Sequence, residues 1–339
     1  MKQAILEKPK KIVFREAKKP EIADNEVLIK IKRVGICGSD IKAYYGKHPY
    51  IKCPIIQGHE FSGVVADLGR KVKKLRVGDK VTVRPQLVCG RCYLCKRGEY
   101  NICENLRVIG CQAEGAAQEL LKVDSNLVVR LPKKMSFEEG AMVEPVAVAV
   151  HAVGRAGRIR GNKVLVLGAG TIGNLTAQVA KSLGAKSVMI TDLSNIRLRI
   201  ARECGVDFTV NVGRTSLPEH LEKHFGPSKA DLIFECVGEE KTINQAISVA
   251  RKGSRIVVVG VFDYKPRTDV GLVQDRELSL IGSLMYKAED YDAAIKLINT
   301  GRIKLRPLMS RTFNFNDYPR AYRFLEKSGD RVMKVFMKF

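Results

Sequence analysis

The stretch KVLVLGAGTIG, residues 163–173, runs from an apolar strand into a glycine-rich turn and the start of a helix. Its glycines follow the spacing G-x-G-x-x-G. Gly168 permits the tight turn, Gly170 lets the backbone approach a pyrophosphate, and Gly173 lets the helix pack on the strand. The helix N-terminus would then receive the phosphate charge. The stretch therefore predicts a strand–turn–helix unit that binds a dinucleotide.

A carboxylate at the end of the next strand indicates which dinucleotide binds. Asp192 closes the strand 187–192, where it can accept hydrogen bonds from both ribose hydroxyls of the adenosine half and would repel a 2′-phosphate. NAD is favoured over NADP, and Arg197 nearby softens that preference. A glycine turn needed only for packing is the alternative. The expected cofactor-binding residues are Gly168, Gly170, Thr171, Ile172, Gly173, Asp192, Arg197 and Val237.

The rhythm of the chain changes near residue 160. Before it lie short alternating strands such as 26–34 and 61–69, separated by glycine-rich turns. After it, apolar strands such as 187–192 and 231–238 alternate with helical segments. This alternation predicts an α/β fold with a Rossmann doubly wound parallel sheet covered on both faces, next to a mostly β part. The tail is helical and then ends in the strand-like VMKVFMKF.

Composition bounds the class of protein. The chain has 339 residues, 45% of them hydrophobic, which is enough for two domains. It has no signal-like start and no apolar run long enough to span a membrane, so we expect a cytoplasmic protein. Lys and Arg total 59 against 36 Asp and Glu, a net charge of +23. Because these basic residues are spread from end to end, a solvated surface is expected rather than specific nucleic-acid binding.

Four cysteines lie close together in VCGRCYLCKRGEYNIC, residues 88–103. A disulfide framework is typical of short secreted chains and does not fit this one. Four thiolates can fill a tetrahedral zinc ion and leave no open position. From the residues alone, a structural zinc site, a nucleic-acid zinc ribbon and a C-x-x-C redox pair remain open.

A second set of possible metal ligands is spread over three segments. Cys37 in VGICGSD and His59 in QGHEFSG are soft and borderline ligands, and each follows an apolar strand at a turn. Glu144 stands in the apolar run AMVEPVAVAVHAV, where an unpaired carboxylate would cost several kcal/mol. A metal ion would remove that objection, as would a backbone donor or a neighbouring Arg.

The motifs together resemble the zinc-dependent medium-chain alcohol dehydrogenases over essentially the whole chain. The resemblance is carried by Gly58-His59-Glu60-x-x-Gly63, C-G-S-D, the four-cysteine segment and G-x-G-x-x-G, in the order of that family. It implies a GroES-like catalytic domain formed by residues 1–147 and 288–339, and an NAD-binding Rossmann domain at 148–287. It also implies NAD, two zinc ions per chain, and a homodimer or homotetramer.

The resemblance assigns roles residue by residue. Cys37 and His59 would hold the catalytic zinc with Glu144, and Glu60 would exchange with Glu144 as a ligand. Asp40 would accept a hydrogen bond from His59, and Ser39 would take the alcohol proton. Many relatives continue that proton relay with a His where this chain has Lys42, so His48 or solvent would complete it. The structural zinc would be held by Cys89, Cys92, Cys95 and Cys103. The remaining thiols, expected to be small reduced residues, are Cys53, Cys111, Cys204 and Cys236.

The pattern looks closest to the polyol, sugar-acid and threonine dehydrogenase branches. It implies oxidation of a secondary hydroxyl of a polyol or sugar acid to a ketone. The alternatives are L-threonine 3-dehydrogenase-like oxidation of an amino alcohol, a zinc-free reductase, and a basic zinc-containing nucleic-acid-binding protein. Polyol relatives have an Arg-Tyr pair where this chain has Tyr286-Lys287. The groups that could instead contact a substrate carboxylate are Lys42, Lys47, His48 and Lys287.

Overall fold

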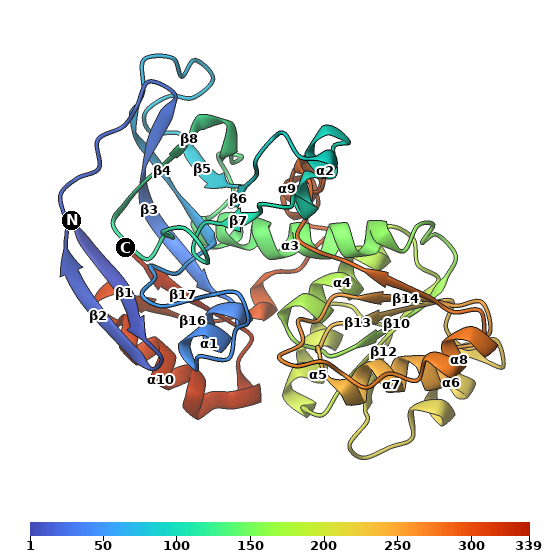
Figure 1. The fold of residues 1–339 in the computed structure, drawn as a ribbon. Coiled ribbons are helices and arrows are strands. Elements are labelled where there is room, and N and C mark those ends of the chain that lie inside the picture. Colours follow the sequence, from blue (N-terminus) through green and yellow to red (C-terminus); the bar gives the residue numbers. More distant parts are fainter.

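Two sheets form the two parts of the molecule in the computed structural model, which describes residues 1–339 (Figure 1). The long helix α3 (Phe137–Arg155) runs from the β-rich part to the parallel-sheet part. Its N-cap Ser136 and Glu139 form a capping box, which explains where the helix begins. The chain returns through Ser283–Lys287 into α9 (Ala288–Asn299).

The parallel sheet has the strand order β12-β11-β10-β13-β14-β15. The order reverses between β10 and β13, and such a switch point is where doubly wound sheets bind ligands. Val164 and Val166 pack on one face with α3 and α4, while Leu165 and Leu167 pack on the other with α6 and α7. The elements are β10 (Lys163–Leu167), α4 (Thr171–Ser182), β11 (Ser187–Asp192), α5 (Asn195–Glu203), β12 (Phe208–Asn211), α6 (Leu217–Phe225), β13 (Leu232–Glu235), α7 (Glu240–Val249), β14 (Arg255–Val258), α8 (Val270–Asp275) and β15 (Ser279–Gly282).

The β-rich part contains a seven-stranded sheet in the order β16-β17-β3-β4-β5-β9, with β8 also paired to β3. The last strand, β17, pairs with β3 antiparallel, and β3 pairs with β4, so the tail completes a sheet begun near the N-terminus. The elements are β1 (Lys2–Lys8), β2 (Lys11–Glu16), β3 (Glu26–Ile36), α1 (Gly38–Tyr44), β4 (Glu60–Leu68), β5 (Lys80–Val83), β6 (Gln86–Leu87), α2 (Tyr93–Lys96), β7 (Arg107–Val108), β8 (Leu120–Asp124), β9 (Val128–Arg130), β16 (Met309–Asn314), α10 (Tyr318–Ser328) and β17 (Lys334–Lys338).

The predicted fold class is confirmed: a mostly β part stands beside a doubly wound parallel sheet. The sequence patterns did not reveal β12 or β15, because each is only four residues long and neither is a continuous apolar run. The expected boundary at 147/148 falls inside α3, and the domain limits stay a prediction. None of the helices combines the length and apolarity needed to cross a bilayer.

Substituting Gly173 tests the glycine turn that fixes α4 against β10. A Cβ there would overlap the backbone carbonyl oxygen of Gly168, so Gly173→Ala must push the helix off the strand. We expect the free energy of unfolding, measured by urea titration, to fall by about 3 kcal/mol. The control Gly154→Ala places its Cβ in open space within α3 and should be neutral or stabilise by up to about 1 kcal/mol. Equal stability of the two variants would contradict this account.

Candidate functional site

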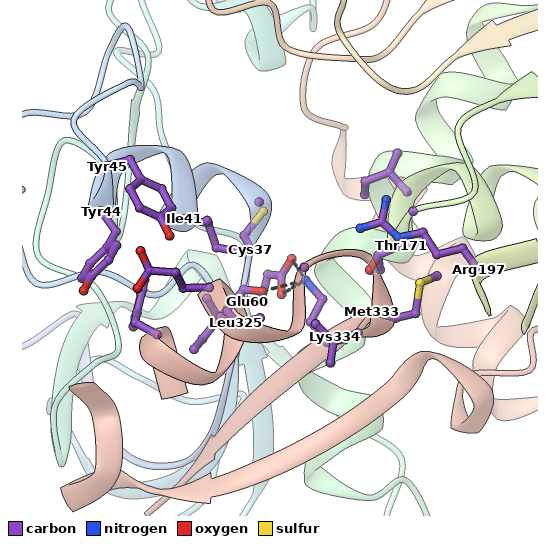
Figure 2. Close-up of a pocket in the computed structure, with 18 of the residues that line it drawn as sticks. Cys37, Ile41, Tyr44, Tyr45, Glu60, Thr171, Arg197, Leu325, Met333 and Lys334 are labelled. Carbon is purple, nitrogen blue, oxygen red and sulfur yellow. Dashed lines mark hydrogen bonds and ion pairs between the residues drawn. The ribbon is translucent and has the colours of Figure 1, made fainter. Parts of the chain in front are cut away.

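A cavity of about 450 Å³ lies where the two parts of the molecule meet. Cys37 and Glu60 line it from the β-rich part, and Thr171 and Arg197 line it from the parallel-sheet part (Figure 2). The residues expected to hold a metal therefore face the residues expected to hold a dinucleotide across one cleft.

Three of the expected metal ligands lie together. Ligand atoms of Cys37, His59 and Glu60 are all within 4.8 Å of one another. Cys37 is the N-cap of α1, and His59 and Glu60 stand at the start of β4. A thiolate, an imidazole and a carboxylate form a donor set that suits zinc and leaves a fourth position open. The residues present thus fit a catalytic zinc ion.

Glu144 lies beside this cluster and is not one of its members. Its side chain is buried in α3, and its Oε1 accepts a hydrogen bond of 2.9 Å from the hydroxyl of Tyr286. Burial raises the pKa of Glu144 to about 7, while the charge of His59 acts in the opposite direction. The expected third ligand is therefore held by a tyrosine, and the structure brings Glu60 to the cluster instead.

The charge of Glu60 is compensated by a buried lysine that the sequence analysis did not single out. Lys334 of β17 places its Nζ 2.7 and 2.6 Å from the two carboxylate oxygens of Glu60 (Figure 2). Burial alone would lower the pKa of Lys334, but the negative charges of Glu60 and Cys37 raise it. Gly35 lies opposite Glu60 on the neighbouring strand, and a side chain there would overlap the Glu60 carboxylate.

Asp40 and Ser39 occupy the first turn of α1. Asp40 is 1% exposed; its Oδ2 accepts the N–H of Cys37, and its Oδ1 lies 3.8 Å from Nδ1 of His59 without a hydrogen-bond partner. The expected hydrogen bond to His59 is thus not formed, although the two groups are close enough to interact electrostatically. Burial raises the pKa of Asp40. Ser39 is half-buried, and no other protein group accepts a hydrogen bond from its hydroxyl.

Burial and neighbouring charges act in opposite directions on the pKa of His59. Burial would lower its pKa, but the charges of Asp40 and of the nearby thiols raise it well above the usual value. One of these thiols belongs to Cys111, whose Sγ lies 3.8 Å from His59 Nδ1. Cys111 had been expected to be an ordinary reduced residue, and its proximity to the site gave no signal in the sequence.

The residues considered for the proton relay and for carboxylate binding do not converge on one point. Lys42 donates from Nζ to the carbonyl oxygen of Val261 at 2.7 Å and forms an ion pair with Asp263. His48 accepts the N–H of Tyr50 at its Nδ1, and burial lowers its pKa. Lys47 is exposed. Lys287 lines a second cavity of about 810 Å³, together with Asn101, His151 and Arg155, away from Cys37.

The four-cysteine segment forms a compact lobe around α2. The Sγ atoms of Cys89, Cys92, Cys95 and Cys103 are all within 4.8 Å of one another, and none is in a disulfide. Separations of 3.5, 3.9 and 4.0 Å between pairs of these sulfurs match the roughly 3.8 Å expected around one tetrahedral zinc ion. Backbone N–H donors from Arg91 and Cys92 lower the pKa of Cys89 to about 6, which favours the thiolate that binds metal. The lobe fits a closed structural zinc site.

The glycine turn has the geometry that a dinucleotide requires. Gly168 has a φ of +95°, and a Cβ there would lie 2.6 Å from Val237, so this turn packs against the end of β13. A Cβ at Gly170 would meet nothing within 4 Å, which leaves open space in front of the α4 N-terminus for a pyrophosphate.

Two charged side chains flank this turn. Asp192 accepts the N–H groups of Ala169 and Ser194, each at 2.8 Å. Its Oδ2 also lies 4.0 Å from the guanidinium of Arg197, which lines the cleft with Gly170, Thr171 and Ile172. The turn, the acid and the arginine predicted from the sequence therefore lie together.

Sequence reasoning missed three side chains of the site: Lys334, Tyr286 and Cys111. Lys334 had a usable signal, since it is a lysine within the otherwise apolar segment VMKVFM, residues 332–337, and such a residue needs a buried partner. Tyr286 was noted only as a substitute for a substrate contact, whereas its hydroxyl points to Glu144.

Comparison with known proteins agrees with this geometry. Residues 23–133 match the alcohol dehydrogenase GroES-like domain, and residues 171–300 match the zinc-binding dehydrogenase family. The chain is 35% identical to D-xylulose reductase of Saccharomyces cerevisiae, with 94% of this chain and 92% of the relative covered. It is 38% identical to 2-dehydro-3-deoxy-L-galactonate 5-dehydrogenase of Pseudoalteromonas atlantica, with 88% and 87% covered.

Solved structures share the whole fold. A zinc-binding dehydrogenase from Sinorhizobium meliloti 1021 bound to NADP has a TM-score of 0.92 and 30% identity, over 100% of this chain and 99% of that one. An alcohol dehydrogenase from Escherichia coli CFT073 complexed with NADH has a TM-score of 0.93 and 31% identity, with the same coverage. With matches of this length and identity, the chain belongs to the zinc-binding alcohol dehydrogenase family, whose members join a GroES-like domain to a Rossmann domain.

Proposed function

We propose that this protein is a zinc- and NAD-dependent oxidoreductase that oxidises a secondary hydroxyl of a polyol or sugar acid to a ketone. The observation that carries the proposal is that the cluster of Cys37, His59 and Glu60 shares one cleft with the N-terminus of α4. Substrate bound at the cluster would lie next to the nicotinamide of a dinucleotide whose pyrophosphate is held by the turn at Gly168–Gly173. Relatives that act on xylulose and on a deoxygalactonate support the substrate class.

Two zinc ions per chain are part of the proposal. One would be held by Cys89, Cys92, Cys95 and Cys103 and would fix the lobe. The other would be held by Cys37, His59 and either Glu60 or Glu144, and it would supply Lewis acidity toward the substrate hydroxyl. The dinucleotide would supply the hydride acceptor.

The protein's own residues would position the substrate and move its proton. Ser39 has a hydroxyl without a protein acceptor and lies in the first turn of α1, two residues after Cys37, so it would receive the hydroxyl proton. Asp40 would hold the ring of His59 by charge across 3.8 Å. Lys334 would keep Glu60 compensated while the cluster is charged. Because the ammonium of Lys42 is already engaged by Val261 and Asp263, proton exit would proceed through His48 or solvent.

The domain limits and the cofactor preference belong to the same proposal. The catalytic domain would comprise residues 1–147 and 288–339, with the NAD-binding domain at 148–287 between them. NAD is proposed because the Asp192 carboxylate stands at the end of β11, where it would repel a 2′-phosphate. The relatives solved with NADP and with NADH bound show that the fold accommodates either cofactor, so the preference must come from local residues.

A substrate screen with metal counting tests the function. Purified protein should contain two zinc ions per chain and reduce NAD with a polyol or sugar acid, and not with L-threonine. Cys37→Ser should keep one zinc ion and lose turnover by at least about a hundredfold. Cys95→Ser should lose the other zinc ion and lower the unfolding temperature. The control Cys53→Ser, a half-buried thiol outside both clusters, should change neither. A wild-type protein that never contains zinc would refute the proposal.

Neutralising Asp192 tests the cofactor preference. Asp192→Asn keeps the side-chain shape but removes the charge that would repel a 2′-phosphate, and it leaves Arg197 without its carboxylate neighbour. The ratio of kcat/KM for NAD to that for NADP should fall about tenfold. A wild-type enzyme that already prefers NADP would contradict the assignment.

A homo-oligomer is also proposed, with the edge of the parallel sheet as its contact. β15 is the last strand of the sheet; the apolar side chains of Leu280 within it and of Leu284, two residues beyond its end, are 41% and 51% exposed. Light scattering should give a mass of two or four chains, and Leu280→Lys should shift it toward one chain. The control Val77→Lys changes an apolar residue that is 64% exposed on the β-rich part and should have no such effect. A monomeric wild type would overturn this proposal.

A further inference from the structure

One side chain of α1 links the β-rich part to the parallel-sheet part. Lys42 lies in α1 of the β-rich part, and its Nζ donates to Val261 O at 2.7 Å and pairs with Asp263 Oδ1 at 2.7 Å. Both partners belong to the loop that follows β14 of the parallel sheet. The ammonium of Lys42 thus contacts two acceptors of different kinds, a carbonyl and a carboxylate. Together they set where the loop lies relative to α1.

The loop that Lys42 contacts follows β14 and is packed tightly against the rest of the parallel-sheet part. Gly238 and Gly260 lie so close that a side chain on either would overlap the backbone of the other segment. Glu240 of α7 accepts the N–H of Arg267 at 2.8 Å, and Asn244 donates to the carbonyl of Arg267 at 2.7 Å. A displacement of Val261 or Asp263 would therefore also displace the turn at Val237–Gly238, which packs against Gly168.

Helix α1, which carries Lys42, is held beside the cluster of Cys37, His59 and Glu60. α1 begins at Cys37, whose N–H donates to Asp40 within the first turn. Gln57, two residues before His59, donates to the carbonyl of Asp40 at 3.0 Å and accepts the hydroxyl of Tyr322 at 2.7 Å. Lys42 thus connects the helix capped by the expected ligand Cys37, which Gln57 ties to the segment of His59, to the loop beside the dinucleotide turn.

We propose that Lys42 is a positioning residue that clamps the loop Gly260–Asp263 onto α1 and holds the cleft closed over the bound dinucleotide. The proposal rests on the dinucleotide-dependent function given above. Lys42 then holds the two parts of the molecule together and does not carry a proton. Closure of this kind sequesters the reacting groups and sets the rate at which the reduced cofactor leaves.

The competing explanation is an ordinary surface ion pair, because the side chains of Lys42 and Asp263 are 30% and 36% exposed. Such pairs often contribute nothing measurable. The structure favours a clamp because the ammonium also holds a backbone carbonyl, and because no other side chain of the β-rich part forms a hydrogen bond or ion pair with residues 260–269.

Hydrogen exchange tests the clamp without any cofactor. In Lys42→Met, the amides of residues 259–268 should exchange about fivefold faster than in the wild type, the factor that corresponds to a loss of about 1 kcal/mol. The matched control is Lys52→Met, which removes the same charge from an exposed position in the connection after α1. The control should exchange like the wild type. Equal exchange in the two variants overturns the clamp.

Release of NADH tests the consequence. Stopped-flow displacement should give NADH dissociation about fivefold faster in Lys42→Met and Asp263→Asn, unchanged in Lys52→Met, and slow again in Lys42→Arg, which keeps a donor for both acceptors. Accelerated release in Lys42→Met that Lys42→Arg does not reverse refutes the clamp. A wild type that binds no NADH refutes the proposed function, and the exchange experiment still decides the clamp.

Discussion

The site depends on cations that balance the negative charge of three carboxylates buried in one region. Asp40, Glu60 and Glu144 are each no more than 4% exposed, and the charges of His59 and Glu60 act on both Asp40 and Glu144. Carboxylates in such surroundings ionise only if cations stand beside them. Lys334 is the permanent cation, bonded to both oxygens of Glu60. A metal ion would be the second. The pairing of β17 with β3, and of β3 with β4, brings Lys334 and Glu60 together. Gly35 of β3 lies between the two side chains and leaves the necessary space.

Much of this architecture could be predicted from the sequence because the signals were local. The glycine turn predicts a backbone shape from a few neighbouring residues. The acid at the end of β11 and the closely spaced cysteines predict ligand-binding groups in the same way. What could not be predicted were long-range contacts. Tyr286 meets Glu144 across 142 residues and Lys334 meets Glu60 across 274, so the choice between the two carboxylates as cluster member depends on where these distant partners place each of them. No local pattern encodes such a choice. The short strands β12 and β15 were missed for a related reason, since parallel neighbours define them rather than their own composition.

The two connections between the parts of the molecule are tied to each other, which restricts their relative motion. His151 of α3 and Asp290 in the first turn of α9 lie 2.7 Å apart. The N–H of Ala288 donates to the hydroxyl of Tyr100 in the cysteine lobe. The lobe therefore contacts the point where the chain returns to the β-rich part. Helix α3 also carries Glu144, so the position of this carboxylate and the packing between the two parts depend on one helix.

The position of Lys334 in the chain has a consequence for biosynthesis. It follows Glu60 by 274 residues, with the whole nucleotide-binding sheet made in between. During translation the strand that carries Glu60 leaves the ribosome long before its counter-ion exists. The buried ion pair can therefore form only once β17 has been synthesised, and until then Glu60 lacks the partner that makes its burial favourable.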